Sequence, residues 1–178
     1  MTEQQYLVVS GLGPDRPGIV AATTRYLTEH GANVEDSRAV VLGGEFGLMV
    51  LASGTAAAVA KVQEDLAELV EATGLQFQTR PTVSPEDHRR SRALPYRVEA
   101  NALDHEGIVQ AVAEALYAAG INIVSLETTV RNAPVTGTEL FSLVARVDIP
   151  DGVAVEAVRA SLAAVARAQC LDVEMRPE

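Results

Sequence analysis

The stretch at residues 11–20 (Gly-Leu-Gly-Pro-Asp-Arg-Pro-Gly-Ile-Val) has the residue types best suited to bind a small molecule. It leads from an apolar run into a predicted helix, so backbone N–H groups point out of a helix start that attracts carboxylates or phosphates. Asp15 offers a carboxylate that can accept from an ammonium group, and Pro17 suits the first turn of the helix. A helix N-terminus beside a carboxylate complements a zwitterion, which is the part that all free amino acids share.

Asp15 has a second interpretation, because an aspartate in front of a helix is most often its N-cap and stabilises the helix by ~0.5–2 kcal/mol. Asn33 and Asn122 also have two interpretations. Each follows a glycine predicted to end a helix, where asparagine commonly forms a turn. A carboxamide at the head of the next strand could instead donate to a ligand carboxylate and accept from its amine. The residues alone leave both interpretations open.

The elements that must position these residues occur twice along the chain. Residues 15–20 resemble residues 104–109 (Asp-His-Glu-Gly-Ile-Val), and later residues 75–81 resemble residues 171–177. Two ordered blocks of matches indicate a tandem repeat of a unit of about 80 residues. We expect one domain at residues 1–82, a polar, proline-bearing linker at 83–93 and a second domain at 94–178.

Each copy predicts the element order β-α-β-β-α-β. A first apolar strand is followed by a helix ending at Gly31 or Gly120, then by two strands, a single second helix and a short last strand. In the first copy the Gly43-Gly44 turn predicts a tight hairpin of residues 33–42 and 45–53. In the second copy the hairpin loop is longer, around residues 131–137. The order predicts an α+β fold of two ferredoxin-like units, each an antiparallel sheet with its helices on one face.

Composition excludes several classes of function. The 178 residues carry a net charge of −10, which opposes phosphate backbones and anionic membranes, so we expect no direct nucleic-acid binding and no membrane docking. No apolar run approaches the ~20 residues of a spanning helix. The single cysteine, Cys170, cannot form a disulfide within the chain and suits a reducing compartment. We therefore expect a cytoplasmic protein.

The first copy closely resembles the glycine cleavage system transcriptional repressor family, and the whole chain resembles tandem ACT-domain proteins. The resemblance is carried by residues 6–9 (Tyr-Leu-Val-Val), 15–20 and 31–38 (Gly-Ala-Asn-Val-Glu-Asp-Ser-Arg), and is specific through about Gly54. It implies a non-enzymatic regulatory protein that senses amino acids, with glycine and serine as first guesses, and that acts through a protein partner such as a transcriptional activator. It also implies a homo-oligomer in which ACT units pair side by side into a continuous sheet.

In ACT domains, ligands lie between paired units, at the strand-to-helix turn of one and the second-strand start of its neighbour. Carried over by position, the resemblance nominates for the first copy Gly13, Asp15, Arg16, Pro17, Gly18, Ile19 and Asn33. The weaker equivalents in the second copy are Asp104, Gly107, Ile108 and Asn122. No cofactor and no metal ion are implied.

The second copy departs from the pattern at the turn. His105 and Glu106 replace Arg16 and Pro17, and an added acid at a helix start disfavours an anionic ligand group. We therefore expect the first turn to be the better site and the second to be partly or wholly structural. A bulky side chain at Gly18 is expected to crowd both the ligand and the helix start.

Two other functions remain open from the sequence. One is a ligand-free assembly module, and the other is an acylphosphatase-like enzyme, for which Arg16 and Asn33 superficially qualify. His30, His88 and His105 lack metal-site spacing and are expected to be plain surface residues. Cys170, which aligns with Gly74, is expected to pack rather than to act as a nucleophile.

Overall fold

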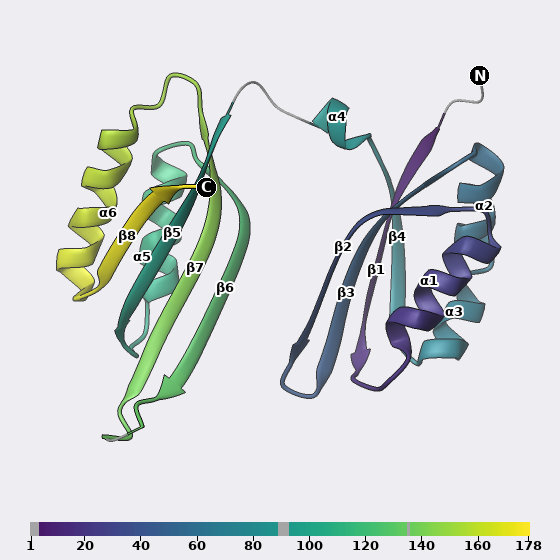
Figure 1. The fold of residues 1–178 in the computed structure, drawn as a ribbon, viewed down its shortest axis with the longest axis horizontal. Coiled ribbons are helices and arrows are strands. Elements are labelled where there is room, and N and C mark those ends of the chain that lie inside the picture. The colour runs from purple at the N-terminus through teal and green to yellow at the C-terminus, as the bar shows by residue number, and fades with distance from the viewer. Residues whose placement is uncertain (1–3, 89–92, 135) are drawn as a thin grey trace. The chain divides into compact units, whose positions relative to one another are not determined.

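The chain forms two compact units, residues 1–88 (unit 1) and 89–178 (unit 2), which are described separately (Figure 1). The structure is a computed structural model and describes residues 4–88, 93–134 and 136–178. No helix in these ranges is both long enough and apolar enough to cross a membrane.

Unit 1 is a four-stranded antiparallel sheet in the order β2-β3-β1-β4, with its helices on one side (Figure 1). Its elements are β1 (Gln5–Pro14), α1 (Ile19–Glu29), β2 (Asn33–Leu42), β3 (Glu45–Gly54), α2 (Ala56–Glu64), α3 (Leu66–Thr73) and β4 (Gln76–Thr82). A short helix, α4 (Pro85–His88), lies in the stretch predicted as a linker. The Gly43-Gly44 hairpin is confirmed, because β2 and β3 meet there with Leu42 opposite Glu45.

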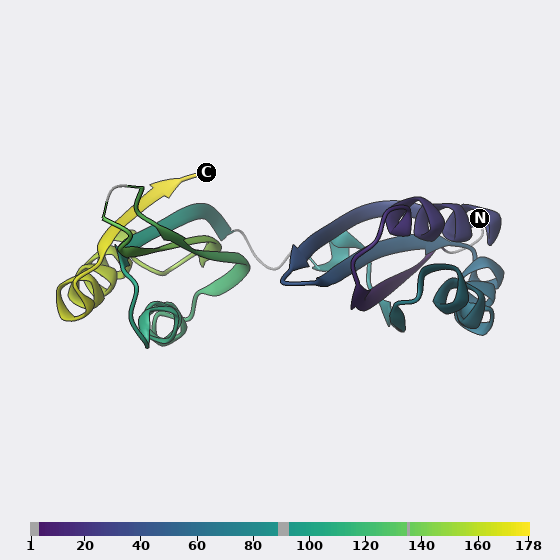
Figure 2. The ribbon, with the colours of Figure 1, turned by 90° about the horizontal axis from the view of Figure 1, so that it is seen from below.

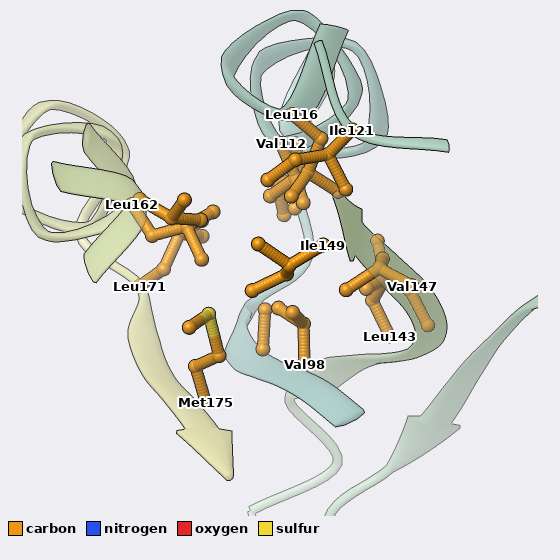
Figure 3. Close-up of a cluster of buried hydrophobic side chains, with 14 of the residues drawn as sticks. Val98, Val112, Leu116, Ile121, Leu143, Val147, Ile149, Leu162, Leu171 and Met175 are labelled. Carbon is orange, nitrogen blue, oxygen red and sulfur yellow. The ribbon is translucent and has the colours of Figure 1, made fainter. Parts of the chain in front are cut away.

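Unit 2 repeats the arrangement with the strand order β6-β7-β5-β8. Its elements are β5 (Ala93–Leu103), α5 (Ile108–Ala118), β6 (Asn122–Asn132), β7 (Glu139–Pro150), α6 (Val155–Gln169) and β8 (Asp172–Pro177). Alternate strand residues and one face of each helix enclose an aliphatic core, as Figure 3 shows for Val98, Leu116 and Leu143. The predicted α+β fold of two β-α-β-β-α-β units is confirmed (Figure 2).

The prediction of a single second helix is wrong for unit 1. The helix is broken at Asp65, whose φ of −94° and ψ of 14° lie outside the helical range, into α2 and α3. Tyr26 of α1 donates its hydroxyl to the Val62 carbonyl, 2.8 Å away, one turn before the break. Side chains that insert into the backbone ladder are a recognised cause of such breaks. In unit 2 the position of Tyr26 is taken by Ala115, which has no hydroxyl group. The second helix of that unit, α6, runs without interruption.

His30 is not the plain surface residue that was expected. Its side chain is only 12% exposed. Its Nδ1 lies 2.8 Å from the Tyr26 carbonyl oxygen and its Nε2 3.2 Å from an oxygen of Asp65. The imidazole therefore joins the end of α1 to the helix break and stacks on the Tyr26 ring at a centroid distance of 4.1 Å.

Cys170 does not pack in the core, because it is exposed. It ends α6 in the left-handed conformation, with φ of 54°, where Gly74 ends α3 with φ of 74°. The alignment of these two positions was right, but the residue serves to end a helix rather than to fill space. His88 lies exposed at the end of α4.

Candidate functional site

The turn between β1 and α1 is fixed by its backbone. The Asp15 N–H donates to the Gly44 carbonyl at 3.0 Å, which anchors the turn to the β2–β3 hairpin tip. Gly18 is the N-cap of α1, with φ of 96°, and its carbonyl accepts from the Ala22 N–H at 2.9 Å. A φ of this sign favours glycine, which explains the residue at this position.

Asp15 does not cap the helix, so the interpretation of this residue as an N-cap is wrong. No capping side chain accepts from the first N–H groups of α1, and the Asp15 side chain is exposed. Pro17 lies before the N-cap rather than in the first helical turn, contrary to expectation. The amide groups at the start of α1 are therefore left without a side-chain acceptor, three residues after an exposed carboxylate.

The space in front of Gly18 is open. A Cβ atom built on this glycine would meet nothing within 4 Å. The expectation that a larger residue would crowd the helix start is therefore wrong, and the cost of substitution comes from the positive φ instead. Gly13 is different, because a Cβ there would lie 3.1 Å from the Leu75 backbone, where β1 approaches the start of β4.

The Arg16 guanidinium is engaged in a contact within unit 1 and is not free to bind a ligand. Its Nη2 donates to the Ala72 carbonyl, 2.7 Å away in the last turn of α3. A cation at this place satisfies a carbonyl that the helix leaves unpaired and offsets the negative end of the helix dipole. Arg16 therefore ties the turn to α3, a contact across 56 residues of sequence.

Ile19 and Ile108 were predicted to contact a ligand, but their side chains are only 3% and 1% exposed and belong to the two cores. They can offer a ligand only their backbone N–H groups. The two turns can therefore offer backbone donors and one carboxylate each, but not the two isoleucine side chains.

The turn between β5 and α5 has the same frame. The Asp104 N–H donates to the Glu139 carbonyl at 2.9 Å, and Gly107, with φ of 90°, is the N-cap of α5 without a side-chain cap. His105 replaces Arg16, with its Nε2 2.9 Å from the Gln169 carbonyl oxygen at the end of α6. His105 is exposed, as expected of a surface residue, but its ring also holds the turn to the end of α6.

Both ring nitrogens of His105 face carbonyl oxygens, since Nδ1 lies 3.0 Å from the oxygen of Glu106. Only the imidazolium can donate from both nitrogens. The carbonyls of Glu106 and then Gln169, together with the Asp104 carboxylate, raise the pKa of His105 above its ordinary 6.5. Neutral imidazole has a single N–H donor, so the two carbonyl contacts of His105 are hydrogen bonds at the same time only while the ring is protonated.

Asn33 and Asn122 do not lie near the turns of their own units. Asn33 pairs with Ser53 at one end of β3, whereas Gly13 pairs with Phe46 at the other end, about 23 Å along the strand at 3.3 Å per residue. Asn122, opposite Asp148, is placed in the same way in unit 2. An acyl-phosphate site built from Arg16 and Asn33 is therefore not formed within one unit.

A polar cluster around Asn33 was missed by the sequence analysis. The Glu35 carboxylate accepts from the Ser53 hydroxyl and from the Asn33 amide at 3.0 Å, and Gln4 donates to Ser53 at 2.9 Å. Hydrogen bonds from Ser53 and then Asn33 lower the pKa of Glu35. The register shift between Val34 and Asp36 is a β-bulge that allows this clustering. No local sequence signal predicts such a bulge.

A hollow of about 630 Å³ on unit 2 was also not predicted. It lies on β5, β6 and β7 and is lined by Asn101, Ala102, Glu127, Thr129, Arg131, Leu140, Phe141, Ser142 and Val144. None of the residues predicted to bind a ligand lines it.

The sheet order and the helices on one face are those of a ferredoxin-like α+β unit, and the sequence match identifies the family. The ACT domain family matches residues 5–80. This chain belongs to the ACT-domain proteins, and its two sheets are two ACT-like units in tandem.

Within that class the chain is related to the glycine cleavage system transcriptional repressors and to the UPF0237 proteins. It is 44% identical to the Escherichia coli repressor over 66 residues, which cover 37% of this chain and 35% of the repressor. It is 40% identical over 70 residues to a UPF0237 protein of Methanopyrus kandleri, covering 38% of this chain and 78% of that protein. The matched stretch thus spans about a third of the length of the E. coli relative.

Two solved structures resemble the whole chain. An unknown protein from Galdieria sulphuraria has a TM-score of 0.83 and 35% identity, covering 99% of both chains. A candidate glycine cleavage system transcriptional repressor has a TM-score of 0.73 and 24% identity, covering 98% of both, and supports the fold alone.

Proposed function

We propose that this chain is a non-enzymatic, amino-acid-sensing regulatory protein whose ligand site is the notch in front of α1. One observation carries the proposal: α1 begins at a glycine N-cap without a side-chain acceptor, three residues after the exposed Asp15. The first N–H groups of α1 can donate to the carboxylate of an amino acid, while the Asp15 carboxylate accepts from its ammonium group.

The regulated partner is proposed to be a protein, and specifically a transcriptional activator. A net charge of −10 disfavours direct contact with DNA. The E. coli relative is named a glycine cleavage system transcriptional repressor, which makes glycine and serine the first ligands to test. Ligand binding regulates the partner if the amino acid binds one assembly of the protein better than another, since it then shifts their populations. The compartment proposed is the cytoplasm.

Asn33 can join this site only from a second copy of the chain. Its position at the far end of the sheet separates it from its own turn. The ten residues of β2 are all exposed at the edge of the sheet. Antiparallel pairing of two β2 edges would bring Asn33 of one copy toward the turn of the other, the arrangement that the ACT resemblance implies.

The test is a thermal-shift screen of the full chain against the twenty amino acids, followed by calorimetric titration of each one that raises the melting temperature. A ligand at 100 times its dissociation constant adds ~2.7 kcal/mol of stability. We expect Asp15→Ala to abolish the shift and Asp104→Ala, its matched control in unit 2, to reduce it less.

Equal loss of the shift from both variants would contradict the asymmetry between the two turns. If none of the amino acids raises the melting temperature, the site is not a ligand site. Turnover of an acyl phosphate by the purified chain would make it an enzyme and overturn the proposal.

A ligand-free assembly module is the second candidate, and one observation favours it. The Arg16 guanidinium already donates to the Ala72 carbonyl and so holds the turn to α3 rather than standing free for a ligand. A screen without any shift, together with a stable oligomer, would support this alternative.

A further inference from the structure

The open face of the unit 1 sheet, on the side away from the helices, carries a patch of apolar side chains. Strand alternation sends Leu7 and Val9 into the core, so their neighbours on β1 face the other way. The open-face patch consists of Val8, Leu12, Val40, Leu42, Met49 and Leu51. Four of these are largely exposed: Leu12 60%, Val40 51%, Leu42 70% and Met49 56%.

The centre of the open-face patch is smooth because Gly47 lies between Leu12 and Val40 in the sheet. A Cβ atom at Gly47 would lie 3.8 Å from Val40 and 3.9 Å from Leu12, which shows that both side chains flank the glycine. The exposed area is on the order of 500 Å², at the upper end of the ~300–600 Å² found for the largest patch on a monomer. Such patches commonly mark an interaction site.

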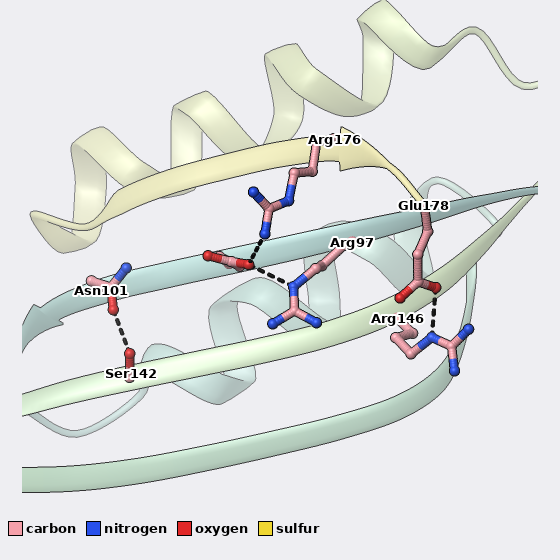
Figure 4. Close-up of polar contacts among 7 residues, drawn as sticks. Arg97, Asn101, Ser142, Arg146, Arg176 and Glu178 are labelled. Atoms are coloured by element: carbon pink, nitrogen blue, oxygen red, sulfur yellow. Dashed lines mark hydrogen bonds and ion pairs between the residues drawn. The ribbon is translucent and has the colours of Figure 1, made fainter.

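Unit 2 shows that the fold itself does not require an apolar open face. The positions of Val8 and Leu51 are taken there by Arg97 and Arg146, which are opposite each other in the register of β5 and β7. Glu99 accepts from Arg97 and from Arg176 at 2.7 Å, and Arg146 pairs with Glu178 at 2.6 Å (Figure 4). The open-face patch of unit 1 is therefore a property of that unit and serves something other than its own core.

We propose that the open-face patch is the contact between two copies of this chain, with two unit 1 sheets packed face to face about 10 Å apart as in a sandwich. A two-fold contact sets the same surface of each copy against itself, so a flat apolar patch meets its own complement. The ionised open face of unit 2 in a second copy would be a poorer cover for the patch, because its charged groups would lose their hydration in the contact.

Area and charge both suit a second copy. A stable interface buries ~800 Å² per partner, of which about 65% is apolar in homodimers, so the patch supplies the apolar centre and its polar neighbours the rim. The charged residues around the patch are Asp36, Arg38, Glu45 and Arg80, two of each sign. In a chain of net charge −10, this locally neutral face escapes the like-charge repulsion that opposes self-association elsewhere.

The test uses adjacent valines on opposite faces of β2. Val40 belongs to the open-face patch and is 51% exposed, whereas Val41 points to the other face and is 49% exposed. We expect the full chain without ligand to form an assembly with an even number of copies in sedimentation equilibrium. Val40→Lys should halve its mass and weaken the contact on the order of 100-fold, as for a central interface residue. Val41→Lys should leave the mass unchanged.

A second variant removes any role of the β2 edge. Met49→Lys changes the centre of the patch on β3, which is an interior strand, and should act like Val40→Lys. Circular dichroism checks that each variant is folded, which the exposure of all three side chains favours. A monomeric wild-type chain at every concentration, or equal dissociation by Val40→Lys and Val41→Lys, would overturn the proposal.

Discussion

The turns in front of α1 and α5 have nearly the same backbone and different side chains. The two N-cap glycines have φ of 96° and 90°, and each turn is anchored by one N–H donor to the neighbouring hairpin. The duplicated unit has thus kept what only the backbone and glycine can supply. It has changed the residues that set the charge beside the helix start, from Arg16-Pro17 to His105-Glu106.

The same contrast holds for the two open sheet faces, apolar in unit 1 and ionised in unit 2. Identical topology therefore carries two different surfaces, and functional differences between the units must come from exposed residues rather than from the fold. Three sets of substitutions test differences between the two units in the core, at the end of the last helix and in the turn. They are ordered from the largest expected effect to the smallest.

The largest effect is expected where the cores are filled differently. A Cβ atom on Gly11 would lie 2.5 Å from the Phe77 ring, so Gly11→Ala overpacks unit 1 and should cost about 1–3 kcal/mol. Unit 2 has Ala100 opposite the smaller Val173 at the matching positions. Adding Phe77→Val to Gly11→Ala should therefore recover part of the loss. Hydrogen exchange of unit 1 peptides in the full chain measures both variants and the Phe77→Val single variant. A double variant destabilised by at least the sum of the two single variants would count against this pairing.

A smaller effect is expected at the ends of the second helices. Cys170 has a left-handed φ of 54°, which costs a residue with a side chain about 1–2 kcal/mol. Cys170→Gly should slow exchange in unit 2 by removing part of this strain, and Gly74→Ala should speed exchange in unit 1. Cys170→Ala, which keeps the strain, is the control for loss of the thiol. A stabilisation by Cys170→Ala equal to that of Cys170→Gly would refute the strain argument.

The smallest effect is the pH dependence of the unit 2 turn. The pKa of His105 is raised in the folded state by the carbonyls of Glu106 and Gln169. The stabilisation of the folded state by the His105 contacts is therefore complete below about pH 6.5, the unperturbed pKa, and is lost as the pH rises through the raised pKa. His105→Gln should speed exchange around the turn at acidic pH and have little effect at alkaline pH. His105→Arg should remove the pH dependence, whereas an equal effect of His105→Gln at both ends of the range would contradict the imidazolium contact.

The sequence predicted those parts of the fold that depend on neighbouring residues. The Gly43-Gly44 turn and the helix-ending Gly31 and Gly120 are local signals, and the structure has each where it was predicted. The break of the second helix in unit 1 could not be predicted, because it goes with the Tyr26 hydroxyl reaching the Val62 carbonyl, 36 residues away. Burial, and then the carboxylates of Asp65 and Glu68, raise the pKa of Tyr26 to about 12, so the hydroxyl keeps its proton for this bond.

The candidate site was predicted only in part, for the same reason. The position of the turn followed from its glycines, but Arg16 and His105 bond to carbonyls 56 and 64 residues away. Aspartate before a helix suggested a cap, yet the N-cap is Gly18, and Asp15 is exposed. No periodicity indicates which long side chain will reach a distant helix end.

The hairpins have a kinetic consequence. In unit 1, β2 and β3 are joined by the two residues Gly43 and Gly44, so this ribbon can close within microseconds. The pairing of β1 with β4 sets Leu7 opposite Pro81 and must wait for a far longer loop to close. The equivalent ribbon in unit 2 has a longer connection, from Asn132 to Glu139, and is slower to nucleate. When the chain refolds from denaturant, the β2–β3 hairpin should therefore form ahead of the β6–β7 hairpin, before either sheet is complete.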